Sequence, residues 1–270
     1  MKYKNLEFER RGAIGLLTFA RPERLNAFSE NLIEEMRHLL AGLVDDFETR
    51  VIIIQGKGRA FSAGADLDFL DSLVSNRHKL GRVQHYYHNF QQRVADLIPQ
   101  LRRLPQPLIA AVRGPAAGGG FSIALACDVI IAGESARFNA AFVRIGLSAC
   151  DLGTSYFLPR RIGLSRAAEY LYTGRFMDAV TAERFGLVSQ VVPDDQVEAR
   201  ALELAEEMVR NSPLGLRMTK EALNQNVDAN SLETAIHLEN RNQALCILTD
   251  DAKESRKAFL EKRKPTYHDR

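Results

Sequence analysis

The sequence contains no tryptophan and only three cysteines among its 270 residues. Cys127, Cys150 and Cys246 lie far apart, and no two of them form a CxxC pair. A disulfide framework requires more cysteines in a shorter chain, and a structural zinc site requires closely spaced ligands, so this pattern argues against both. Such cysteine usage is typical of proteins in a reducing compartment.

The chain also lacks a long apolar run and a strong excess of either charge. No apolar stretch approaches the ~20 residues that span a bilayer, and the N-terminal MKYKNLEFERRG has no signal-peptide core. The net charge is only +2, with basic residues spread along the chain, which gives no footprint for nucleic acid. The six histidines show no HExxH-type spacing. We therefore expect a cytoplasmic protein with no metal site and no membrane or nucleic-acid partner.

The composition that remains is that of a globular protein, with 46% hydrophobic and 26% charged residues. Short apolar runs at 13–19, 51–54, 108–112 and 129–132 read as strands, and they alternate with amphipathic stretches. Ser29 can cap a helix whose apolar residues fall on one face. This alternation predicts an α/β fold. Helical spacing dominates after residue 192, so we expect a core of residues 1–200 and a helical region of residues 201–270.

Two glycine-rich turns follow expected strands: GRAFSAGADL (residues 58–67, the first turn) and GPAAGGGFS (residues 114–122, the second turn). Small residues leave the backbone N–H groups unobstructed, and the second turn leads into an apolar helix whose positive end stabilises negative charge. Two such amides could bind an oxyanion, although glycines can also simply form tight turns. The sequence has no GxGxxG, P-loop or GxSxG motif. A cap or packing role for Ser122 is favoured over a nucleophilic one.

Four segments in order resemble the enoyl-CoA hydratase/isomerase (crotonase) superfamily: RPERLNAF (21–28), the first turn, PLIAAVRGPAAGGGFSIALACDVIIAGESARF (107–138) and LYTGRFMDAVTAERFGLVSQVV (171–192). The resemblance extends to the tail AFLEKRKPTY (258–267). It implies a spiral of ββα units with a C-terminal helical oligomerisation region, assembled as a trimer or a dimer of trimers. It also implies an acyl-CoA thioester substrate and no separate cofactor, since coenzyme A is part of the substrate.

The resemblance assigns roles to individual residues. The amides of Ala65 and Gly119 would polarise the thioester carbonyl. Arg24 resembles a contact to the CoA phosphates, although a surface arginine is an equal alternative. The remaining CoA-binding assignments are the adenine and pantetheine path at Ala63, Asp66 and Leu67, and the adenosine end, sometimes in a neighbouring subunit, at Phe259 and Lys262.

The chain departs from the family at the two glutamates that hydratases use as acid and base, because their positions fall on Ser122 and Phe142. Asp151 is the remaining carboxylate nearby. It resembles an aspartate that moves a proton in dienoyl-CoA isomerases, and its segment is similar to the nucleophile segment of 4-chlorobenzoyl-CoA dehalogenases. The dehalogenase helpers, a histidine and a tryptophan, are missing. Apolar neighbours should raise the pKa of Asp151, although an aspartate here could also cap the helix beginning at Gly153 or Thr154.

The sequence thus predicts an enzyme that stabilises a thioester enolate at Ala65 and Gly119 and uses Asp151 as its acid or base. Isomerisation, hydration or hydrolysis of an atypical acyl group would fit. A catalytically silent acyl-CoA-binding protein and a hydrolase of a non-CoA β-diketone are the alternatives.

Overall fold

The computed structural model describes residues 3–75 and 81–269. Within these ranges the largest sheet has six strands in the order β1-β2-β3-β4-β6-β9. Only β1 and β2 pair antiparallel, and every other neighbour in this sheet is parallel. The strands are β1 (Leu6–Arg11), β2 (Ile14–Phe19), β3 (Val51–Gly56), β4 (Leu108–Val112), β6 (Val129–Gly133) and β9 (Gln190–Val192).

A smaller sheet in the described residues pairs three short strands, β5 (Pro115–Ala117), β7 (Arg137–Asn139) and β8 (Met177–Asp178). The chain passes from the large sheet to the small one twice, from β4 to β5 and from β6 to β7, and a helical stretch follows each passage. This repeated strand–strand–helix unit winds the core into a spiral. The predicted α/β spiral of ββα units is confirmed.

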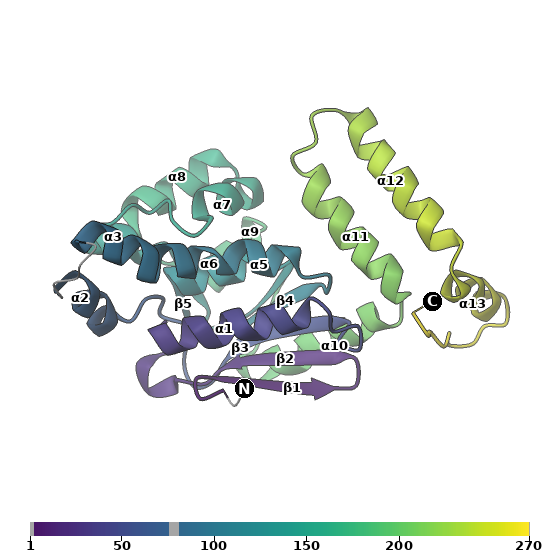
Figure 1. Cartoon of the computed structure of the whole chain (residues 1–270), viewed down its shortest axis with the longest axis horizontal. Helices are drawn as coiled ribbons and strands as arrows, with labels where there is room; N and C mark the ends of the chain where they lie inside the picture. The colour runs from purple at the N-terminus through teal and green to yellow at the C-terminus, as the bar shows by residue number, and fades with distance from the viewer. Residues whose placement is uncertain (1–2, 76–80, 270) are drawn as a thin grey trace.

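Helices cover both faces of the large sheet (Figure 1). The helices of the core are α1 (Glu30–Leu43), α2 (Leu67–Ser75), α3 (Arg82–Tyr86), α4 (Gln92–Ala95), α5 (Leu97–Arg103), α6 (Gly119–Ala126), α7 (Thr154–Ile162), α8 (Leu164–Thr173), α9 (Ala179–Arg184) and α10 (Val197–Val209). A π-helical turn, Tyr87–Gln91, joins α3 to α4. Ser29 caps α1 as predicted, because its side chain accepts from the N–H of Leu32. Short 3-10 turns lie at Pro22–Arg24, Ala141–Ile145 and Asp194–Gln196.

The helical region that leaves the core begins later than residue 200. Residue 200 lies inside α10, which packs its buried Val197, Ala201 and Ala205 against one face of the large sheet. Helices α11 (Pro213–Asn226) and α12 (Leu232–Ile247) then project from the core as a pair, with α13 (Asp250–Leu260) beyond them (Figure 1). The packing of α10 therefore makes it part of the core rather than of the C-terminal region.

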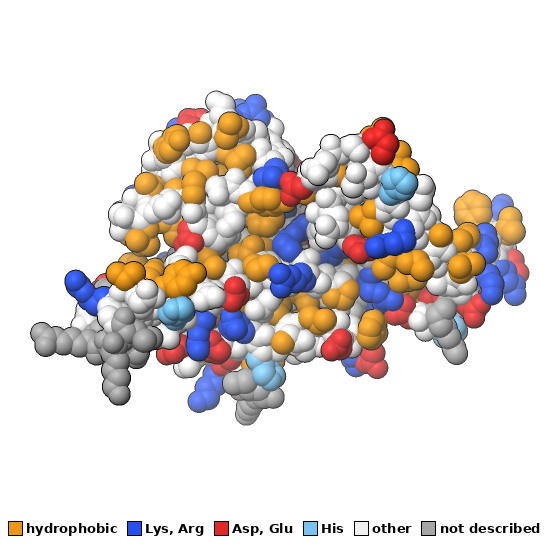
Figure 2. Space-filling model, turned by 45° about the horizontal axis from the view of Figure 1, so that its top comes forward, with side chains coloured by type: hydrophobic (Ala, Val, Ile, Leu, Met, Phe, Trp, Pro, Cys, Tyr) orange, Lys and Arg blue, Asp and Glu red, His pale blue; other side chains and the backbone are white. Residues whose placement is uncertain are grey.

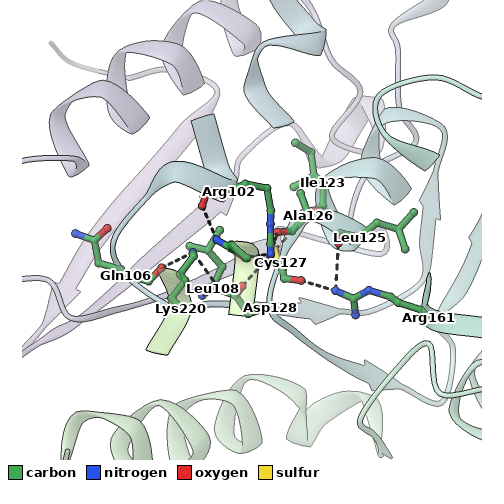
Figure 3. A network of polar contacts seen from close by, with 11 residues as sticks. Arg102, Gln106, Leu108, Ile123, Leu125, Ala126, Cys127, Asp128, Arg161 and Lys220 are labelled. Atoms are coloured by element: carbon green, nitrogen blue, oxygen red, sulfur yellow. Dashed lines mark hydrogen bonds and ion pairs between the residues drawn. The ribbon is translucent and has the colours of Figure 1, made fainter. Parts of the chain in front are cut away.

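The C-terminal end of α6 is held by cationic side chains (Figure 3). Arg102 donates to the carbonyl of Ala126 at 3.2 Å, and Arg161 donates to the carbonyls of Leu125 and Cys127 at 3.2 and 2.6 Å. Positive charge at a helix C-terminus complements the helix dipole. These contacts fix the helix whose opposite end begins in the second glycine-rich turn.

A third cation, Lys220 on α11, ties the C-terminal helices to this network. Its buried Nζ lies 3.1 Å from Asp128 Oδ2 and donates to the carbonyl of Gln106 at 2.7 Å. Asp128 also pairs with Arg102 at 2.8 Å (Figure 3). Removing one partner of a buried ion pair leaves the other charge poorly solvated, which destabilises a protein strongly.

We expect Lys220→Met to lower the free energy of unfolding by about 3 kcal/mol, the lower end for a broken buried pair, since Arg102 still neutralises Asp128. Urea denaturation measures this difference. The matched control is Lys253→Met, whose lysine pairs with Asp250 at the surface, and whose loss should cost less than about 1 kcal/mol. Equal losses in the two variants would contradict the anchoring role of Lys220.

Candidate active site

A cavity of about 460 Å³ lies beyond the ends of β3 and β4, where both glycine-rich turns meet the α3–α4 segment. Most of its charged lining residues come from the segment before α1, the first turn and the start of α2, and the exposed ones form a polar rim: Glu23, Arg24, Arg59 and Asp68. Apolar side chains form the remaining wall: Leu70, Tyr86, Phe90, Val94, Phe142, Ile145, Leu147 and Leu152. A polar rim around an apolar interior is the usual form of a small-molecule site.

The two glycine-rich turns touch each other through their backbones. Ser62 N donates to the carbonyl of Pro115 at 3.1 Å, and Ala117 N donates back to Ser62 at 2.9 Å. Gly64, at φ +86°, approaches so closely that a β-carbon there would lie 2.7 Å from the carbonyl oxygen of Ala117 and 3.0 Å from Gly119 N. Only glycine permits both this φ value and this approach.

Ala65, in the first turn, presents a free backbone N–H. It forms a parallel bridge with Phe28, whose N–H donates to Gly64 and whose carbonyl accepts from Asp66. In such a bridge the two bonds flank the central residue, so the N–H of Ala65 faces away from Phe28. Among the described residues it has no acceptor, and Ala65 lines the cavity.

Gly119, in the second turn, presents the other free N–H. It is the first residue of α6, where a helix leaves its N–H groups without intrahelical acceptors. No acceptor for it lies among the residues that the structure describes, and Gly119 lines the same cavity as Ala65. Two unused donors from different turns therefore border one space.

Asp151 lines the same cavity from the turn before α7. Its Oδ1 accepts from Leu152 N at 2.8 Å and from Gln91 Nε2 at 2.7 Å. Burial raises the pKa of its carboxyl above the ordinary value, outweighing these two hydrogen bonds, which lower it. The side chain does not cap α7, because Gly153 is the N-cap and the N–H of Thr154 donates to the main-chain carbonyl of Asp151.

Ser122 and Phe142 carry no carboxyl group and lie beside this site. Ser122 is fully buried, and its hydroxyl donates to the carbonyl of Gly118 within the helix start. Phe142 lines the cavity as part of its apolar wall. The packing role expected for Ser122 agrees with this geometry.

Comparison with known proteins identifies the family. The sequence profile described as "Enoyl-CoA hydratase/isomerase" matches residues 9–270. The chain belongs to the enoyl-CoA hydratase/isomerase family. A "Probable enoyl-CoA hydratase" of Mycobacterium bovis is 40% identical over 260 residues, which cover 96% of this chain and 90% of that protein. A "Probable enoyl-CoA hydratase, mitochondrial" of Dictyostelium discoideum is 38% identical over 266 residues, 97% of this chain and 90% of that protein.

Solved structures of the family share the fold along almost the whole chain. The crystal structure of enoyl-CoA hydratase from Bacillus anthracis superposes with a TM-score of 0.91 at 33% identity, covering 99% of this chain and 100% of the other. An enoyl-CoA hydratase from Polaromonas sp. JS666 gives a TM-score of 0.88 at 31% identity, covering 97% of this chain and 99% of that one. The chain is thus an enzyme of the enoyl-CoA hydratase/isomerase type in both sequence and fold.

The residues predicted to line the CoA path, Arg24, Ala63, Asp66 and Leu67, all border the cavity rim. Asp66 is buried and pairs with Arg21 and Arg24 at 3.1 and 3.4 Å. Arg24 also pairs with Asp68, and this hydrogen bond raises the pKa of the Arg24 guanidinium. A phosphate at this rim would therefore compete with Asp68 for Arg24.

Phe259 and Lys262, the predicted contacts to the adenosine end, are not brought to this cavity within one chain. Phe259 belongs to α13 and is 84% exposed. Figure 1 shows α13 at the opposite end of the molecule from α2 and α3, which flank the cavity. Neither residue is among those that line the cavity of its own chain.

Sequence reasoning did not single out Tyr86, Phe90 and Gln91, which come from the α3–α4 segment. Tyr86 and Phe90 line the cavity, and the side-chain amide of Gln91 donates a hydrogen bond to Asp151. The segment is amphipathic, which predicted a helix but not the π-helical turn that sets the direction of these side chains.

Across the described ranges, no group of three His, Cys, Asp or Glu side chains is placed to hold a metal ion. None of the helices described is long and apolar enough to cross a bilayer.

Proposed function

We propose that this chain binds an acyl-CoA thioester, stabilises its enolate at the N–H groups of Ala65 and Gly119, and moves a proton with Asp151. One observation supports this most directly. The two unused amides and a carboxylate with a raised pKa border the same cavity. Each part has a role that the other cannot perform, since amides stabilise negative charge and the carboxylate exchanges a proton.

The reaction that fits best is the isomerisation of an enoyl-CoA. Asp151 removes a proton from the acyl α-carbon, and the electron pair moves into the thioester carbonyl. The resulting oxyanion accepts hydrogen bonds from Ala65 and Gly119. Asp151 then returns a proton, which can have exchanged with solvent, to the γ-carbon, and the double bond moves without net gain or loss of atoms. Hydration is disfavoured because Ser122 and Phe142 stand where the family resemblance places two glutamates.

The apolar wall supports an acyl chain rather than a charged group at the Asp151 end. Tyr86, Phe90 and Phe142 face the cavity there together with aliphatic side chains. A desolvated acyl group beside a partly buried carboxylate also keeps the carboxyl pKa high, which brings it closer to the range of a useful base. Coenzyme A would lie toward the rim, along Ala63 and Leu67.

Deuterium incorporation tests this proposal across many acyl groups at once. The chain is incubated in D₂O with a panel of 2-enoyl-, 3-enoyl- and dienoyl-CoA thioesters, and products are analysed by mass spectrometry beside calorimetric titration of each ester. We expect binding together with deuterium in the acyl chain or a shifted double bond. If esters bind tightly but gain no deuterium and form no product, the chain is a catalytically silent acyl-CoA-binding protein instead. If none of the esters binds, the alternative function, hydrolysis of a non-CoA β-diketone, is favoured instead.

We propose further that the chain assembles as a trimer or a dimer of trimers through its C-terminal helices. Figure 2 shows hydrophobic side chains on the outer surface of this region, and Leu232, Leu248 and Leu260 are at least 71% exposed. Covering these side chains in an assembly would remove apolar surface from water. It would also place Phe259 and Lys262 near a neighbouring copy. Sedimentation equilibrium measures the mass of the assembly, and a mass equal to that of one chain would rule this proposal out.

A further inference from the structure

The π-helical turn at Tyr87–Gln91 changes which side chains of the α3–α4 segment point to the same side of the helix. Tyr86 and Gln91 are five positions apart, and in a regular α-helix such residues point about 140° away from each other. A π-turn has a wider i to i+5 repeat, so it turns both toward one side. The structure shows the result, because the Tyr86 hydroxyl donates to Gln91 Oε1 at 3.4 Å.

The other end of the Gln91 amide reaches Asp151. Gln91 Nε2 donates to Asp151 Oδ1 at 2.7 Å, and the N–H of Leu152 donates to the same oxygen at 2.8 Å. Both donors thus hold one carboxylate oxygen. No hydrogen-bond partner for Oδ2 lies within the described ranges of the chain, and Asp151 lines the cavity. The carboxylate therefore has one fixed oxygen and one oxygen left for the cavity.

We propose that Gln91 is a positioning residue, which fixes Oδ1 of Asp151 through its amide and leaves Oδ2 to exchange a proton with the acyl chain. The amide of Gln91 also connects this carboxylate to the Tyr86 hydroxyl in the cavity wall. The importance of this arrangement for turnover rests on the proposed function. The effect of Gln91 on the carboxylate itself does not, and it can be measured in the free protein.

Electrostatics around Asp151 make this effect measurable. Tyr86 is the titratable group that faces Asp151 from the α3–α4 segment, and burial together with the Asp151 charge raises its pKa, so it stays protonated. Among the described residues no charged side chain shifts the pKa of Asp151. Hydrogen bonds from Gln91 and Leu152 are thus the contacts that stabilise the ionised carboxylate against its burial.

The experiment is a ¹³C NMR titration of the Asp151 carboxyl in protein labelled at aspartate Cγ, with the signal assigned by its loss in Asp151→Asn. Gln91→Leu removes the donor at similar side-chain volume. We expect the Asp151 pKa to rise by about one to two pH units, the value of a hydrogen bond to a charged group. Gln92→Leu, an exposed amide on the same segment, is the matched control and should leave the titration unchanged. Gln91→Ala repeats the test if Gln91→Leu does not fold.

An unchanged Asp151 titration in folded Gln91→Leu or Gln91→Ala would overturn the positioning role, as would an equal shift in Gln92→Leu. On an active substrate, the acid limb of kcat/KM in Gln91→Leu should move to higher pH with the carboxyl pKa. A merely structural loss would lower the rate without moving this limb. Unchanged turnover in Asp151→Asn, together with the NMR shift in Gln91→Leu, would contradict the proposed function and leave the positioning of the carboxylate by Gln91 standing.

Discussion

Gly119→Pro is expected to lower kcat by about 10²–10³-fold, the usual effect of removing one oxyanion-hole donor. Proline has no N–H, so the substitution deletes the proposed donor directly. Its backbone suits the site, because Gly119 is the first residue of α6 and proline is favoured at the first position of a helix. Substrate affinity should change less than kcat, since the hydrogen bond strengthens as charge develops on the oxygen.

Gly119→Ala is the matched control for this experiment. A β-carbon at this position approaches the Phe28 ring to 2.9 Å, and both substitutions introduce that carbon. Alanine keeps the N–H, so any loss it causes measures the steric effect alone. The ratio of kcat between the alanine and proline variants then measures the contribution of the Gly119 N–H to catalysis. Circular dichroism checks that both variants fold. Similar kcat values for the two variants would show that the N–H of Gly119 does not act on the substrate.

Asp151→Asn is expected to lower kcat by about 10²–10⁴-fold, because a general acid or base typically contributes that much. Asparagine keeps the shape and can still accept the hydrogen bonds from Gln91 and Leu152. It cannot take up a proton in the working pH range. Steady-state assays on the substrate identified by deuterium incorporation measure the loss, and unchanged turnover would remove Asp151 from the mechanism.

The same substitution should raise the thermal stability at neutral pH. Burial raises the folded-state pKa of Asp151, so its stabilising contribution is complete below the unfolded pKa and is lost as pH rises through the folded pKa. Ionising this carboxyl group therefore costs more free energy in the folded protein than in the unfolded chain. Asparagine removes that cost, so its Tm should exceed that of the parent, and the difference should narrow toward about pH 4, the ordinary range of Asp. A lower Tm at neutral pH would contradict this electrostatic account.

Elements with strong hydrophobic patterns could be predicted from sequence. The strand β4 occupies the predicted residues 108–112, and all five of its side chains are buried. The strand β1 has no comparable signal, because it is an edge strand with Leu6 as its one fully buried side chain, and its charged sequence LEFERR has no clear pattern. Strands β5, β7 and β8 have only two or three residues, too few for a periodic signal.

The candidate site divides in the same way. Glycine reports backbone conformation, so GRAFSAGADL and GPAAGGGFS by themselves indicate exposed amides, and Gly64 and Gly118 indeed have positive φ values. The contact between Gln91 and Asp151 joins residues 60 positions apart and depends on a π-helical turn. No local pattern predicts either feature. Likewise, the pairing of Arg24 with Asp68 across 44 positions arises from tertiary packing.

The most direct test is a crystal structure of the chain with butyryl-CoA, a saturated thioester that has no double bond to move. The account predicts the thioester oxygen within about 2.7–3.1 Å of both Ala65 N and Gly119 N, with the acyl chain facing Asp151 Oδ2. An oxygen that contacts neither amide, or a thioester bound outside this cavity, would contradict it.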